Sequence, residues 1–237
     1  MTRYSILVPY MGKTAHWRRV FAYTQREWQR ALRSAPDLDV EIVAYEQRAN
    51  GPMHVSRCVN RAAARATGDV FVLWGADHLP DVGTLRWLDM VRTLKWHEWQ
   101  PLFERTAVYS EQSTAQILSG ESPDGVDMVF DSVVNLCIGI FAVGRDAFEA
   151  LGGEDERFTG WGMEDAAFRH ALTAFYGEPS APRPGSVLRS LWHPVQRRDR
   201  HAAANVTLYH SEYVDKHLDP QALSGTIERA RAARLPE

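Results

Sequence analysis

Two short segments carry side chains suited to metal and phosphate chemistry. LWGADHLPD at 73–81 places Asp77 and His78 directly after an aliphatic run, and LWHPVQ at 191–196 places His193 before a proline. A carboxylate oxygen can hold a divalent cation, and the cation can hold a diphosphate. Aspartate, histidine and phosphate oxygens together suit Mn²⁺, because they mix hard and borderline ligands. Taken singly, each segment also fits an ordinary turn, a helix cap or a buried histidine.

A third segment, FTGWGMED at 158–165, carries side chains suited to sugar binding and proton transfer. Gly160 and Gly162 permit close backbone approach and unusual dihedral angles. Trp161 presents a flat apolar face of the kind on which a pyranose ring stacks. Glu164 and Asp165 follow at the start of a helical pattern, where they could simply stabilise a helix N-terminus. In the functional interpretation, one carboxylate orients a hydroxyl and its neighbour removes the proton.

The elements that must position these side chains alternate between strand and helix. Strands are predicted at 4–10, 39–46 and 70–77, and helices at about 14–33 and 54–69. This order is typical of an α/β fold with a mostly parallel central sheet flanked by helices. Because such sheets bind ligands beyond the carboxyl ends of their strands, the loops at 9–10, 46–47 and 75–78 become candidate binding loops.

The rest of the chain is expected to complete one domain over 1–237. The pattern predicts a helix at 81–95, a loop-rich insertion at about 96–125, a strand and helix at 137–148, a strand at 187–193 and a helical tail from about 220.

Composition excludes several classes of protein. The net charge of −3 argues against a dedicated DNA-binding protein, and the hydrophobic content of 45% is ample for a large core. Cys58 and Cys137 lie far apart with no CxxC motif, which indicates free thiols in a reducing compartment. No apolar run approaches the ~20 residues of a membrane span. We therefore expect a cytoplasmic protein, bacterial or, if phage-encoded, in the host cytoplasm.

Residues 135–172, NLCIGIFAVGRDAFEALGGEDERFTGWGMEDAAFRHAL, resemble the donor–acceptor segment of the β-1,4-galactosyltransferase family. That family has a Gly-containing strand, a short helix, a Gly-rich turn and then Gly-Trp-Gly-x-Glu-Asp, and the polypeptide N-acetylgalactosaminyltransferases share part of this pattern. Upstream, EQRANGPMHVSRCVNRAAARATGDVFVLWGADHLP resembles the wider GT-A glycosyltransferases, in which a helix and a strand lead to an Asp-x-Asp motif. The resemblance implies a GT-A fold and a member of bacterial or phage origin.

The resemblance also implies a role for each matching residue. Asp77 and His193 match the metal ligands, and Asp165 matches the general base that deprotonates the acceptor. Trp161 and Glu164 fall where the acceptor sugar is held. The donor nucleotide sugar is expected to meet Pro9, Tyr10, Glu46, Arg57, Asp77 and Gly139.

Two departures from the family pattern bear on these roles. Gly75 stands where the first Asp of Asp-x-Asp is expected, which affects the contact to the ribose. Ala166 stands where a further acid is common, which affects the acceptor assignment.

The expected activity is that of a metal-dependent inverting glycosyltransferase. Mn²⁺ or Mg²⁺ would be the cofactor, a UDP-sugar the donor, and a hydroxyl on a protein or glycan the acceptor. Three alternatives stay open: transfer to a modified base in DNA, a nucleotidyltransferase, and a catalytically inactive module that binds nucleotide sugars. Release of pyrophosphate would select the second, and tight binding without turnover the third.

Overall fold

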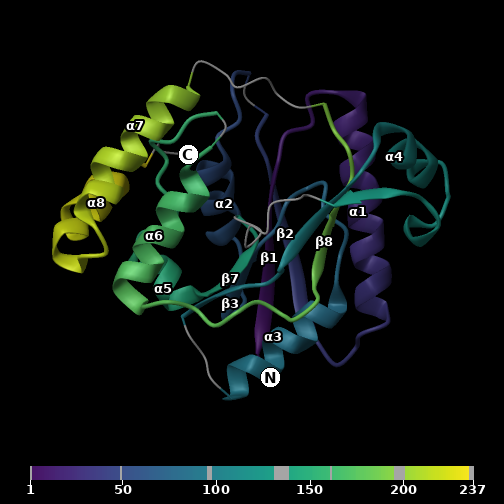
Figure 1. Ribbon diagram of the computed structural model, residues 1–237, viewed down its shortest axis with the longest axis horizontal. Coiled ribbons are helices and arrows are strands. Elements are labelled where there is room, and N and C mark those ends of the chain that lie inside the picture. Colours follow the sequence, from purple (N-terminus) through teal and green to yellow (C-terminus); the bar gives the residue numbers. More distant parts are fainter. Residues whose placement is uncertain are drawn as a thin grey trace.

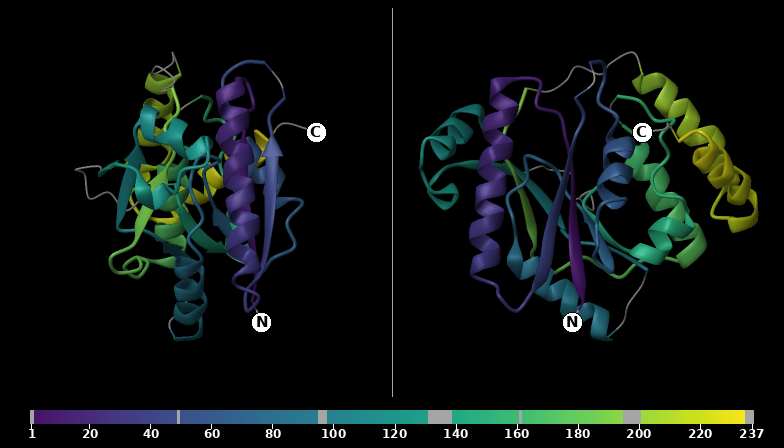
Figure 2. Two further views of the ribbon diagram at one scale, coloured as in Figure 1. Left: turned by 90° about the vertical axis from the view of Figure 1, so that its right-hand side faces the viewer. Right: turned by 180° about the vertical axis from the view of Figure 1, so that it is seen from behind.

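The computed structural model places a central β-sheet between two layers of helices (Figure 1). It describes residues 2–48, 50–94, 98–130, 139–160, 162–194 and 201–234. Two further views show the same layers from the side and from behind (Figure 2).

The central sheet has the strand order β2-β1-β3-β7-β4. Its strands are β1 (Arg3–Tyr10), β2 (Asp39–Glu46), β3 (Val70–Leu73), β4 (Trp99–Pro101) and β7 (Phe141–Gly144). β1 pairs in parallel with β2 and β3, whereas β7 is antiparallel to both β3 and β4. Four strands therefore run in one direction and β7 alone runs in the other, which confirms the mostly parallel sheet expected from the sequence.

The two faces of the sheet follow from the alternation of side chains along each strand. Leu7, Phe71 and Leu73 pack on one face against α2 (Val55–Ala63), α5 (Arg145–Ala150), α6 (Glu164–Tyr176) and α8 (Pro220–Ala232). Ile6 and Val72 pack on the other face against α1 (Ala15–Arg33) and α3 (Val82–Leu94). Both layers hold the carboxyl ends of β1 and β3 in fixed positions.

A second sheet, with the order β6-β5-β8, lies beside the first. It comprises β5 (Arg105–Tyr109), β6 (Met128–Phe130) and β8 (Val187–Ser190). The segment at about 96–125 holds β4, β5, α4 (Glu111–Leu118) and the short helix η1 (Pro123–Gly125), so it is more regular than the loop-rich insertion expected. Its strands are short, and β5 pairs with the distant β8, a partner that no local pattern indicates.

The ends of three strands shape the site, and two of these strands, β3 and β8, end before their predicted bounds. β1 agrees with the strand predicted at 4–10 and so continues through Pro9. The ladder to β3 ends at Leu7, so at Pro9 only β2 pairs with β1. On the side that faces β3 there is no ladder left for the missing N–H of Pro9 to interrupt. Conversely, β3 ends at Leu73 and β8 at Ser190, which leaves the residues that follow each strand free to form binding loops.

The chain ends in α7 (Ala202–Glu212), η2 (Val214–Lys216) and α8. α8 begins where the helical tail was expected and buries Leu223 and Ile227 against the core. None of the helices in the described part of the chain is long and apolar enough to cross a membrane.

Candidate active site

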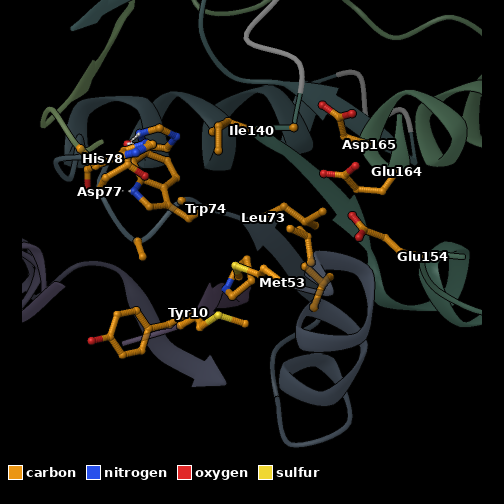
Figure 3. A pocket seen from close by; sticks show the side chains of 18 of the residues that line it. Tyr10, Met53, Leu73, Trp74, Asp77, His78, Ile140, Glu154, Glu164 and Asp165 are labelled. Carbon is orange, nitrogen blue, oxygen red and sulfur yellow. Dashed lines mark hydrogen bonds and ion pairs between the residues drawn. The ribbon is translucent and has the colours of Figure 1, made fainter. Parts of the chain in front are cut away.

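A cavity of about 500 Å³ opens at the carboxyl ends of β1 and β3. Figure 3 shows Asp77 and His78 at one end of it and the carboxylates of Glu154, Glu164 and Asp165 at the other. The side chains between the two ends are mainly apolar: Met11, Met53, Val55, Val59, Leu73, Trp74 and Ile140. The lining residues thus form one cavity with polar side chains at each end and mainly apolar side chains between them.

Asp77 and His193 meet at the first end. Nε2 of His193 lies 3.9 Å from Oδ2 of Asp77, and their side chains are 33% and 13% exposed. The loop after β3 is tied to the end of β8, because the backbone N–H of Leu191 donates to the carbonyl of Asp77. Two residues later the chain presents His193, whose ring packs against Trp17 with centroids 4.4 Å apart and ring planes tilted by 32°.

His78 packs beside Gly75 at this end of the cavity and explains why position 75 is a glycine. Its Nδ1 lies 2.8 Å from the hydroxyl of Ser190, and burial lowers the pKa of its ring. A Cβ atom on Gly75 would lie 2.5 Å from Cδ2 of His78 and 3.1 Å from Oδ1 of Asp77. The imidazole therefore fills the space into which a side chain at position 75 would project.

The donor set suits a divalent cation that shares its coordination shell with a ligand. Asp77 offers oxygen and His193 nitrogen, a pair that Mn²⁺ accepts, and the two atoms are close enough to bind one ion together. Among the described residues no group of three or more His, Cys, Asp or Glu side chains forms a metal site. The remaining positions would thus fall to water or to phosphate oxygens of a substrate.

Glu164 and Asp165, at the second end, follow a turn with unusual backbone angles. Gly160, Gly162 and Met163 have φ of 75°, 105° and 74°, so the turn uses the left-handed region repeatedly before α6 begins at Glu164. Asn205 of α7 closes the turn, because its Nδ2 donates to the carbonyls of Thr159 and Gly162 at 3.0 Å each.

These carboxylates hold protons more tightly than ordinary ones. Burial and the neighbouring Asp165 raise the pKa of Glu164 to about 7. Burial also raises the pKa of Asp165, although the backbone N–H of Ala166 and the charge of Arg169 oppose the shift. Glu154 is only 3% exposed, and burial and both neighbouring acids raise its pKa well above the ordinary range. A group that titrates near neutrality is suited to general acid–base chemistry.

Gly139 borders the same carboxylates from the other side. Its φ is 95°, and a Cβ atom placed on it would lie 3.1 Å from Oδ2 of Asp165. The absence of a side chain at this position therefore leaves room for Asp165 to face the cavity.

The structure brings together most of the residues singled out in the sequence. Pro9, Tyr10, Asp77, Gly139, Glu164, Asp165 and His193 all line the cavity. Glu46 lies at the end of β2, ion-paired with Arg48, and Arg57 lies on α2; neither is among the lining residues. Their donor-binding role stays a prediction. Trp161 and Cys137 lie outside the described residues, while Cys58 is a free, buried thiol.

Trp17, Met53 and Glu154 are among the lining residues that were not singled out in the sequence. Trp17 follows the helical spacing of α1, so its pattern indicates only a packed helix face. Glu154 stands in GGEDER, where three consecutive acids resemble an exposed turn. The two glycines that precede Glu154, within the segment at 135–172, were the one sequence signal that could have identified this residue.

No family model and no curated protein matches the chain. Solved structures do match it. The catalytic domain of Drosophila beta1,4galactosyltransferase 7 in complex with xylobiose is 16% identical, with a TM-score of 0.52, over 87% of this chain and 80% of that one. GalNAc-T7 with UDP, GalNAc and Mn²⁺ is 9% identical, with a TM-score of 0.59, over 99% of this chain and 55% of that one. S. aureus TarS is 10% identical, with a TM-score of 0.52, over 80% and 60%. The chain therefore has the GT-A fold that these glycosyltransferases share.

Proposed function

We propose that the chain is a metal-dependent inverting glycosyltransferase. It moves a hexose-type sugar from a nucleotide-diphosphate donor, by preference a UDP-sugar, to a hydroxyl acceptor on a protein or glycan. The observation that carries the proposal is the single cavity with the Asp77–His193 pair at one end and the Glu164–Asp165 pair at the other.

At the first end, Asp77 and His193 would hold Mn²⁺ or Mg²⁺. Such a cation neutralises charge on a departing diphosphate. Pro9 and Tyr10, at the end of β1, border the space for the nucleotide, and Tyr10 is held in place by stacking on Phe21 with ring centroids 4.0 Å apart. The apolar side chains in the middle of the cavity exclude water and so protect the activated sugar from hydrolysis.

At the second end, Asp165 takes the proton from the acceptor hydroxyl as that oxygen attacks the sugar. Its N-terminal position on α6 and the charge of Arg169 favour the ionised form that a base requires. Glu164 orients the hydroxyl. Because the base and the phosphate-binding pair lie at opposite ends, attack comes from the face away from the diphosphate, which inverts the anomeric centre.

The ligands of similar structures support this assignment. GalNAc-T7 has been solved with UDP, GalNAc and Mn²⁺, and the Drosophila enzyme with manganese, UDP-Gal and xylobiose. Among proteins with the GT-A fold, the sequence of the segment at 158–165 favours a relationship to the β-1,4-galactosyltransferases. A modified nucleobase as acceptor is the main alternative within the same chemistry.

A panel of nucleotide sugars with Mn²⁺ tests the proposal by the release of nucleoside diphosphate. We expect release from one class of donor, loss of release with EDTA, and loss of transfer in Asp165→Asn with nucleoside-diphosphate binding retained. Release of pyrophosphate would identify a nucleotidyltransferase instead. Tight donor binding without any turnover would identify an inactive sugar-binding module.

A further inference from the structure

Glu154 differs from its sequence neighbours Asp155 and Glu156, whose carboxylates both accept hydrogen bonds, in that one of its carboxyl oxygens is left unpaired among the described residues. Asp155 accepts hydrogen bonds from Arg157 at 2.7 Å and from the hydroxyl of Tyr213 at 3.0 Å, and Glu156 accepts one from Asn60 at 3.0 Å. Oε2 of Glu154 is buried and has no hydrogen-bond partner among the residues that the structure describes, although the Ser56 hydroxyl lies near the carboxyl group and favours its ionised form. Leaving a buried polar atom unpaired destabilises the fold, so an acid in this position is suited to binding a ligand.

The backbone holds Glu154 in its position facing the cavity. Nδ2 of Asn60 donates to its carbonyl at 2.8 Å, and its own N–H donates to Oδ1 of Asn60 at 2.9 Å. This paired contact joins α2 to the segment that connects α5 and α6. Figure 3 shows the carboxyl group projecting towards the cavity beside those of Glu164 and Asp165. The orientation is thus set by the fold.

The surroundings of this carboxyl group favour its protonated form. Glu164 and Asp165 of α6 face it, as does Cys58 of α2, whose thiol has a pKa raised by burial to about 12. Burial comes first and the two acids next in raising the pKa of Glu154. A protonated carboxyl group donates one hydrogen bond and can still accept others, which matches a sugar hydroxyl.

We propose that Glu154 is a substrate-binding residue that contributes to sugar specificity, its carboxyl group sharing a hydrogen bond with one hydroxyl of the sugar seated against Glu164 and Asp165. The proposal rests on the proposed function and extends it. It assigns the third acid a role in recognition, distinct from orientation by Glu164 and proton removal by Asp165. The sugar is that of the donor or of the acceptor, and the experiment below tells the two apart.

The test compares Glu154→Ala and Glu154→Gln with wild type, with Glu156→Gln as a matched control two residues away. Circular dichroism and thermal melting establish that each variant folds. We expect Glu154→Ala to raise the KM of one sugar substrate roughly tenfold, the value of one neutral hydrogen bond. The Kd of UDP with Mn²⁺ should stay within about twofold. The KM that moves, for donor or for acceptor, identifies the sugar.

A series of monodeoxy sugars then identifies the hydroxyl. With wild type, the KM of one deoxy sugar should be raised by the same factor. With Glu154→Ala, removing that hydroxyl should raise the KM no further, because the contact is already lost. We expect the KM of wild type to rise at alkaline pH as Glu154 ionises, and the KM of Glu154→Gln, which cannot ionise, not to show this rise. A buried acid with a purely structural role would move neither the deoxy series nor the pH profile.

Direct binding of the sugars, followed by NMR, keeps this test separate from transfer. Unchanged KM and unchanged sugar binding in Glu154→Ala would overturn the role of Glu154 while leaving the transferase proposal intact. Absence of transfer in wild type, with weaker sugar binding in Glu154→Ala, would overturn the transferase proposal and support the binding role. Equal losses in Glu154→Ala and Glu156→Gln would show a general disturbance and so reject it.

Discussion

Asp77 and His193 come from loops far apart in the chain, yet they meet because the carbonyl of Asp77 accepts a hydrogen bond from the N–H of Leu191. Their side chains are 13% and 33% exposed, respectively, and Trp17 packs against the imidazole. At the scale of single residues, the positions of Asp77 and His193 are therefore fixed by the contacts around these two side chains.

Replacing either residue with alanine should remove most of the metal-dependent part of nucleotide binding. Removing one of two protein ligands weakens the hold on the cation, and the diphosphate loses its partner. Isothermal titration of UDP with and without Mn²⁺ in Asp77→Ala and His193→Ala measures this. We expect a loss of at least tenfold in the Mn²⁺-dependent gain; a full metal response in either variant would show that the residue is not a ligand.

Glu164 gives the chain a stability that depends on pH. Its pKa is about 7 in the folded protein against 4.5 ordinarily, so the native state binds this proton more tightly than the unfolded chain. The free energy of unfolding therefore falls as pH rises from 4.5 to 7. The loss should be on the order of 1–3 kcal/mol.

Glu164→Gln should abolish that loss, because glutamine does not ionise. We expect its Tm to exceed that of wild type at pH 8 by a few degrees, at ~2–4 °C per kcal/mol, and to equal it at pH 4.5. Glu228→Gln, at an exposed position of α8, is the control and should show no such pattern. A Tm difference that is constant with pH would contradict the raised pKa.

At the scale of elements, the turn before α6 depends on α7. Three residues of the turn have positive φ, and Asn205 satisfies two of its carbonyls from the neighbouring helix. A strained turn persists only where the surroundings hold it. The carboxylates at the start of α6 are therefore positioned by a residue that never enters the cavity.

Asn205→Ala should release the turn and displace Asp165 while leaving the metal-binding end unchanged. We expect a loss of about 1–3 kcal/mol in stability and a fall in kcat that exceeds any change in the Kd of UDP with Mn²⁺. Thr207→Ala is the control on the same helix, because its hydroxyl bonds only within α7, to Ala203. If kcat were unaffected in Asn205→Ala, the turn would not depend on this contact.

At the scale of the whole molecule, ligand binding should stabilise the fold as one unit. The cavity is lined by residues of α2 and α6 from one helical layer and by Trp17 of α1 from the other, so a ligand in it contacts both layers. Saturating UDP with Mn²⁺, at about 100 times its Kd, should contribute ~2.7 kcal/mol and raise Tm by several degrees. Differential scanning fluorimetry measures this; UDP without Mn²⁺ should give a clearly smaller shift, and equal shifts would argue against a metal-bridged diphosphate.

Much of this architecture could be predicted from local patterns. The strand at 39–46 agrees with β2, and the strand-end rule for parallel sheets located Tyr10 and Asp77. The antiparallel β7 and the pairing of β5 with β8 could not be predicted, because short strands take their partners from tertiary context. Glu154 was not identified, because the sequence alone does not distinguish a buried glutamate from an exposed one, and only the packing of the folded chain does.

The imidazole beside Gly75 makes two positions of the chain interdependent. An engineer who wished to install an aspartate at 75 could not do so by one substitution, since the new side chain would collide with His78 at 2.5 Å. Shrinking His78 first would open the space but sever its link to Ser190. Variants at this corner of the protein must therefore be built and compared as pairs, and a library that samples each position alone would score both changes as harmful.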